Sequence, residues 1–106
     1  MRLSRTAEAE FEAIDAYSHE QFGDEVATTY MRGFGELFDL LRRHPLVGQE
    51  AFELGKGIRS LKHRSHRIFY RVEKDEVRII RILHHAMDAT RALRMVTRQS
   101  QINAVD

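Results

Sequence analysis

Apolar residues recur at helical spacing through the first 43 residues of the chain. The first stripe has its members three or four positions apart, at Ala7, Phe11, Ile14 and Tyr17. Gly23 follows as the expected end of that helix, and a second stripe then runs from Val26 to Leu41. Pro45, the only proline, ends the second stripe. The pattern therefore predicts two helices joined by a tight turn, which is a helical hairpin.

The helix starts carry local capping signals. Thr6 is the expected N-cap of the first helix, with Glu8 and Glu10 in its first turn, where the helix dipole favours negative charge. Asp24 is the expected cap of the second helix. We expect the aromatic residues of both stripes to lie in the core, namely Phe11, Tyr17, Tyr30, Phe34 and Phe38.

From Gly57 onward the pattern changes to alternation at every second residue, which is typical of strands. Residues 66–72 show it best: one face carries Ile68, Tyr70 and Val72, and the other carries Arg67, Phe69 and Arg71. After a polar turn at 74–76, residues 77–83 are apolar on both faces, as in a central strand. Residues 57–63 form a weaker strand, and 3–5 are a candidate short one.

This order of elements predicts an α+β fold, in which the N-terminal helical hairpin packs on one face of a small, mainly antiparallel β-sheet. At 106 residues the chain has room for one domain, which we expect to span residues 1–95. Residues 88–93 are expected to add a helical turn. Residues 96–106 show no periodicity, and we expect a flexible C-terminal tail.

Composition excludes several classes of protein. With 42% hydrophobic and 31% charged residues, the chain has an ordinary globular balance. It has no apolar run of membrane-spanning length and no apolar signal core near residue 1, so we expect no membrane partner and no export. It also lacks cysteine, which excludes disulfides and thiolate chemistry. The expected location is cytoplasmic.

Charge is divided unevenly along the chain. Residues 1–55 hold five Lys/Arg and eleven Asp/Glu, whereas residues 56–106 hold twelve and five, so the halves carry net charges of −6 and +7. A basic half can meet phosphate groups or an acidic protein segment. The acidic hairpin would repel phosphate and no recognition-helix pattern is present, so we expect no direct sequence-specific binding of nucleic acid.

Histidines gather near the predicted strand ends, at His63, His66, His84 and His85. Adjacent histidines on a strand point to opposite faces, and no acidic or cysteine residue stands at a metal-ligand spacing from them. A structural or target-contact role is therefore the preferred interpretation, with catalysis and metal binding as alternatives. We expect no metal and no cofactor.

An ordered set of segments resembles the ParE toxins of bacterial toxin–antitoxin pairs. These segments are 2–5, 7–9, 44–48, 57–59, 66–72, 77–84 and 86–91, so the resemblance spans about residues 2–94. It implies a toxin that inhibits DNA gyrase, is neutralised by a ParD-like antitoxin and has no catalytic residues of its own.

RelE-like toxins share this fold but cut mRNA on the ribosome, using lysines, arginines and a C-terminal aromatic residue. In an alignment started at the strand from His66, only Arg67 is retained from that set. The other positions fall near Ile58, Ser60, Met87 and Leu93. A ribosome-dependent endoribonuclease, using Arg67 with Arg59 or a strand-end histidine, is the runner-up. An inactive member that only binds antitoxin is the third hypothesis.

Two sets of binding residues follow. If the hairpin leaves one strand face open, Phe69 between Arg67 and Arg71 is an exposed docking surface for antitoxin, and Phe69→Asp should weaken that complex without disturbing the fold. A solvated sheet face is the alternative. The target-contact candidates are Arg59, Arg67, Arg81, His84, Met87, Asp88 and Arg91, although the last three also fit a simple helix start.

Overall fold

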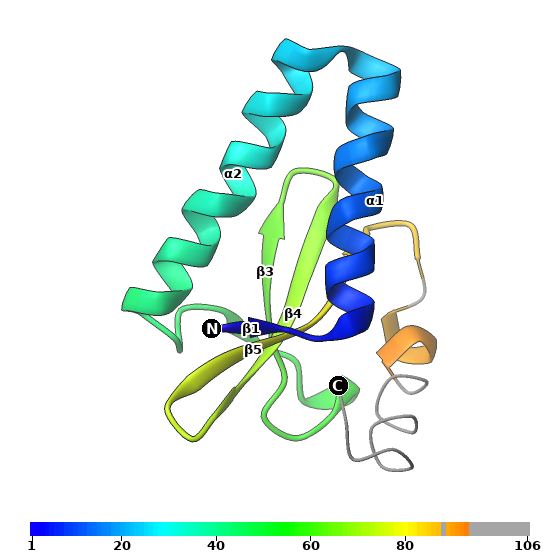
Figure 1. Ribbon diagram of the computed structural model, residues 1–106. Coiled ribbons are helices and arrows are strands. Elements are labelled where there is room, and N and C mark those ends of the chain that lie inside the picture. Colours follow the sequence, from blue (N-terminus) through cyan, green and yellow to red (C-terminus); the bar gives the residue numbers. More distant parts are fainter. Residues whose placement is uncertain (88, 94–106) are drawn as a thin grey trace.

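A computed structural model of the chain describes residues 1–87 and 89–93. Helices α1 (Arg5–Phe22) and α2 (Asp24–Arg43) form a hairpin that packs on one face of a five-stranded sheet (Figure 1). The strands are β1 (Arg2–Leu3), β2 (Gln49–Glu50), β3 (Arg59–His63), β4 (His66–Glu73) and β5 (Glu76–His84). Their order across the sheet is β1-β5-β4-β3-β2.

The predicted α+β architecture is confirmed. Strands β3, β4 and β5 form the expected antiparallel meander, and the candidate short strand near the N-terminus is present as β1. β1 runs parallel to β5, with Arg2 opposite Arg78, so the sheet is mixed. Strand β2 and the short 3-10 helix η1 (Phe52–Leu54) were not predicted, because neither is long enough to show a period.

The helix caps differ from those expected. Ser4, not Thr6, caps α1: its backbone is extended, and its hydroxyl accepts a hydrogen bond from the Ala7 N–H at 3.0 Å. The same hydroxyl donates to the Ile80 carbonyl at 2.8 Å, which ties the helix start to β5. Asp24 does not cap α2, because Gly23 holds that position with a φ of 83°.

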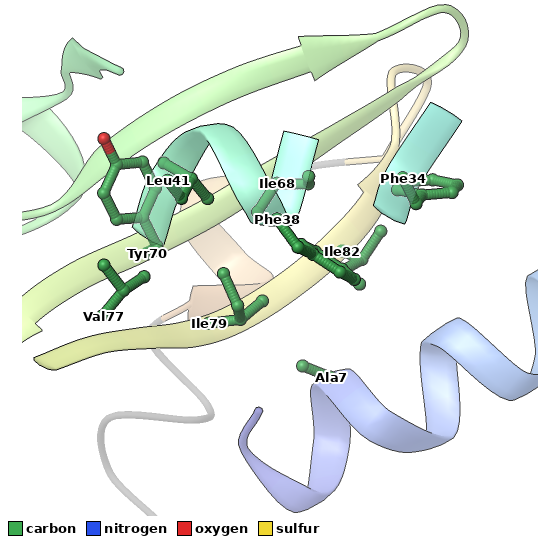
Figure 2. Close-up of a cluster of buried hydrophobic side chains, with 9 residues drawn as sticks. All are labelled: Ala7, Phe34, Phe38, Leu41, Ile68, Tyr70, Val77, Ile79 and Ile82. Carbon is green, nitrogen blue, oxygen red and sulfur yellow. The ribbon is translucent and has the colours of Figure 1, made fainter. Parts of the chain in front are cut away.

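Most of the predicted core lies between the hairpin and the sheet. Figure 2 shows α2 placing its aromatic side chains over those of β4 and β5, and the buried set is Ala7, Phe34, Phe38, Leu41, Ile68, Tyr70, Val77, Ile79 and Ile82. Phe11 and Tyr30 pack against this cluster, as the helical stripes predicted.

Tyr70 also fixes the connection that follows α2. Its side chain is fully buried, and its hydroxyl donates to the Pro45 carbonyl at 2.7 Å while accepting from the Gly48 N–H at 2.8 Å. This burial raises the pKa of Tyr70. A Cβ on Gly48 would lie 2.5 Å from the Tyr70 hydroxyl oxygen, so only glycine fits beside it.

The second face of the sheet is covered, which corrects the expectation of an open face. Phe69 is only 4% exposed, and it belongs to a second buried cluster with Ala51, Ile58, Ile80, Leu83, Ala92 and Leu93. The cover comes from the segment around η1 and from a helical turn at residues 89–93. That turn was predicted as 88–93, of which Asp88 lies outside the described residues. So does the predicted tail, 96–106.

Candidate functional site

An apolar groove opens between the tip of the helical hairpin and the β3–β4 turn. It encloses about 620 Å³. Its apolar wall comes from both helices and includes Ala13, Ile14, Tyr17, Phe22, Val26 and Tyr30. Its polar rim comes from the strand ends and consists of Arg64, Ser65, His66 and His84.

The groove exists because the hairpin extends beyond the sheet. In Figure 1 the tip of the hairpin rises past the β3–β4 turn. The end of α1 and the start of α2 therefore have no strand beneath them. Tyr17, Phe22 and Val26 are consequently 59%, 60% and 56% exposed. The prediction that Tyr17 lies in the core is therefore wrong, since the stripe continues past the end of the surface that it covers. Apolar side chains this exposed and this close together are typical of a binding surface.

Histidines and a tyrosine form the polar end of the groove. The Tyr30 hydroxyl lies 2.6 Å from Nδ1 of His66, and Nε2 of His63 donates to the Tyr30 carbonyl at 3.0 Å. Burial, and then the neighbouring His84, lower the pKa of His66 to about 4. His66 is thus neutral at pH 7, and its Nδ1 shares a hydrogen bond with the Tyr30 hydroxyl. The sequence could not show this bond, because 36 positions separate the partners.

The depressed pKa of His66 predicts a stability that falls on mild acidification. The unfolded chain binds the proton below pH 6.5, whereas the folded chain resists it until about pH 4, so stability is lost as the pH falls through that window. Solvent screening at this half-buried site limits the effect to about 1 kcal/mol, or about 5 °C in Tm. His66→Asn keeps a hydrogen-bonding group beside Tyr30 but cannot titrate, so the difference between the Tm–pH curves of the two proteins should report the protonation of His66 alone. Parallel curves would contradict this account.

Two of the predicted target-contact arginines hold the fold together. Arg59 donates to the Gly48 carbonyl at 2.9 Å and pairs with Glu50 at 3.1 Å, which secures β2. The Arg81 side chain is 13% exposed, and it pairs with Glu10 at 2.6 Å. Both arginines therefore have structural partners within the chain.

Glu10 makes structural contacts that the sequence did not reveal. One carboxylate oxygen binds Arg81, and the other accepts from the Ile82 N–H at 2.9 Å. Arg81 in turn donates to the Ala92 carbonyl at 3.0 Å. These bonds join α1, β5 and the turn at 89–93. The two made by Glu10 span about 70 residues, a separation that no local pattern encodes.

The remaining candidates are distributed over both sides of the sheet. Arg67 is half-buried and donates to the Ser60 hydroxyl at 2.8 Å, and Arg71 is also half-buried, beside Gly57. His84 lies on the groove rim. Met87 is 52% exposed, and Arg91 is exposed on the turn at 89–93. Of the predicted target-contact and antitoxin-binding residues that the structure describes, only His84 therefore lines the apolar groove. The others of these do not form one continuous surface with it.

Within 1–87 and 89–93, no group of three or more His, Asp or Glu side chains has an arrangement that could hold a metal ion. The helices of that part of the chain are all too short or too polar to cross a bilayer.

The hairpin over a five-stranded sheet defines a small α+β domain of a known class. A solved chain with this fold, from the "Chromosomal ParDE TA system from P. aeruginosa", matches with a TM-score of 0.67 and 24% identity, covering 78% of this chain and 91% of that one. The chain belongs to the ParE toxin family: residues 1–89 match the family described as "ParE toxin of type II toxin-antitoxin system, parDE".

Curated relatives agree with the family. "Toxin ParE1" of Caulobacter vibrioides is 40% identical over 88 residues, covering 83% of this chain and 91% of the relative. "Toxin ParE1" of Mycobacterium tuberculosis is 33% identical over 92 residues, covering 86% and 94%. The resemblance noted from the sequence is thereby confirmed.

Proposed function

We propose that this ParE toxin inhibits DNA gyrase, is neutralised by a ParD-like antitoxin and has no catalytic residues of its own. One observation carries the non-catalytic part. Two positions where a RelE-like nuclease would place a lysine and its C-terminal tyrosine are Ile58 and Leu93, which are 2% and 1% exposed in the cluster around Phe69. Because these side chains are buried in the core of the second face, neither position offers the base or the proton donor that a RelE-like nuclease would use there.

The apolar groove supports the antitoxin part of the proposal. The family description names the parDE pair, so a partner protein accompanies toxins of this family. A groove of about 620 Å³ between two helices and a strand turn suits the apolar face of an amphipathic helix. We therefore place the antitoxin in the apolar groove. The surface first expected, at Arg67, Phe69 and Arg71, is less suitable because Phe69 is buried.

Two reactions run side by side test the proposed activity. Purified toxin should abolish supercoiling by DNA gyrase, and primer extension on translated mRNA should show no new ends. Cells expressing the toxin without antitoxin should filament and mount a DNA-damage response while translation continues at first. Cut mRNA with intact supercoiling would instead identify the endoribonuclease, and no effect in either reaction would identify an inactive member.

A substitution at Arg67 distinguishes the two candidate activities, because both gyrase inhibition and mRNA cleavage would use this side chain. In a nuclease, Arg67→Ala removes transition-state stabilisation and lowers the rate by about 10²–10³. If Arg67 only contacts gyrase, the same change lowers the affinity for gyrase about tenfold, and raised expression of the toxin restores toxicity. We expect the second result, with Arg67→Lys still toxic.

A further inference from the structure

A basic hollow lies at the β3–β4 turn, where it shares Arg64, Ser65 and His66 with the apolar groove. It encloses about 380 Å³, and its lining consists of Lys62, Arg64, Ser65, His66, Arg67 and His85. Its lining contains no carboxylate. Arg42, Arg59, Arg78 and Arg81 each pair with an acidic side chain. Within residues 1–87 and 89–93, by contrast, no acidic side chain pairs with Lys62, Arg64 or Arg67.

The strand register explains why these cations lie together. Lys62 stands directly opposite Arg67 in the β3–β4 pair, on the same sheet face as Phe69. Like charges at opposed positions repel, so the arrangement is unfavourable unless an anion lies between them. The acidic hairpin packs on the other face, with the sheet in between (Figure 1).

Two of the lining groups, Arg67 and His85, are held in place by the fold. Arg67 is fixed by its hydrogen bond to the Ser60 hydroxyl at 2.8 Å. His85 donates twice to the Ser65 carbonyl, from its backbone N–H at 2.8 Å and from Nδ1 at 3.0 Å, which orients the imidazole ring. A preorganised set of donors loses less entropy when it binds a ligand.

We propose that the basic hollow binds phosphate groups. Two guanidinium groups offer planar forks that match phosphate oxygens, Lys62 adds a point charge, and Ser65 adds a hydroxyl. The same chemistry recognises the polyphosphate of a nucleotide and the backbone of a DNA strand. The proposal goes beyond gyrase inhibition and does not depend on it.

The backbone conformation at Arg64 favours a glycine variant as a way to remove charge from the basic hollow. Arg64 has a φ of 51°, a left-handed conformation that glycine adopts without strain. Lys74, in the β4–β5 turn, has a φ of 50° and lies at the other end of β4 between Glu73 and Glu76. Arg64→Gly and Lys74→Gly therefore remove the same charge from the same backbone conformation, one inside the basic hollow and one far from it.

Binding is measured on the full-length toxin with two probes, a labelled single-stranded DNA by fluorescence anisotropy and pyrophosphate by calorimetry. We expect saturable binding that weakens with salt. Arg64→Gly should reduce affinity about five- to tenfold and lower the salt slope by about one, while Lys74→Gly changes affinity less than about twofold. If Arg64→Gly fails to fold, Lys62→Gln, at an exposed position, provides the same test.

The two probes also separate the sources of phosphate. Tighter binding of the DNA indicates a nucleic-acid backbone, tighter binding of pyrophosphate indicates a free polyphosphate, and either result supports the basic hollow as the site. Absence of saturable binding to both probes would overturn the proposal. Equal weakening by Arg64→Gly and Lys74→Gly would also overturn it, because that result reflects only general attraction to a basic chain.

Discussion

Replacing Phe69 with aspartate is expected to unfold the protein. Phe69 is 4% exposed and packs in the second-face cluster with Ile80, Leu83 and Leu93. Loss of a buried phenylalanine side chain alone costs about 3–5 kcal/mol, and an unpaired carboxylate in the same place adds several more. A domain of this size has a total stability of about 5–15 kcal/mol.

Phe52→Asp is the matched control for this change. Phe52 lies in η1, in the segment that covers the same sheet face, but it is 69% exposed. Its replacement should leave Tm within about 3 °C of the unmodified protein. Circular dichroism and thermal melts distinguish the two variants. A cooperative melt of Phe69→Asp at the original temperature would contradict the buried position and restore the sheet face as a docking surface.

Phe69 was predicted to be exposed and is buried, which shows what strand periodicity can and cannot predict. Alternation correctly separated Ile68 and Tyr70 from Phe69, so the two faces of β4 were known from the sequence. Whether the second face was covered depended on η1 and on residues 89–93, which are too short to show a period. The usable signal was the apolar residues on both faces of β5, since such a strand needs cover on both sides.

The groove was hidden from the sequence for a different reason. A helical stripe defines which side of α1 is apolar, but it does not define how far the sheet extends beneath that side. Tyr17 continues the stripe of Phe11 and Ile14, yet it projects beyond the strands and is exposed. The family resemblance, in contrast, depended on an ordered set of sequence segments. It required neither the cover on the second sheet face nor the length of the hairpin beyond the sheet.

Replacing Val26 with glutamate is expected to release the toxin from its antitoxin. Val26 is 56% exposed, and it lies in the first turn of α2, where negative charge favours the helix, so the fold should be unaffected. In the complex that we propose, an antitoxin helix would bury this carboxylate in the apolar groove without a partner. The cost is about 3 kcal/mol, which corresponds to about a hundredfold loss of affinity.

Val47→Glu is the matched control, because Val47 is 47% exposed and follows the opposite end of α2. Titration of the toxin with its antitoxin should show the hundredfold loss for Val26→Glu and an unchanged affinity for Val47→Glu. In cells that produce both proteins, Val26→Glu should stop growth while Val47→Glu should not. If Val26→Glu instead loses its toxicity and still binds antitoxin normally, the apolar groove contacts the toxin's target, and the antitoxin must bind elsewhere on the molecule.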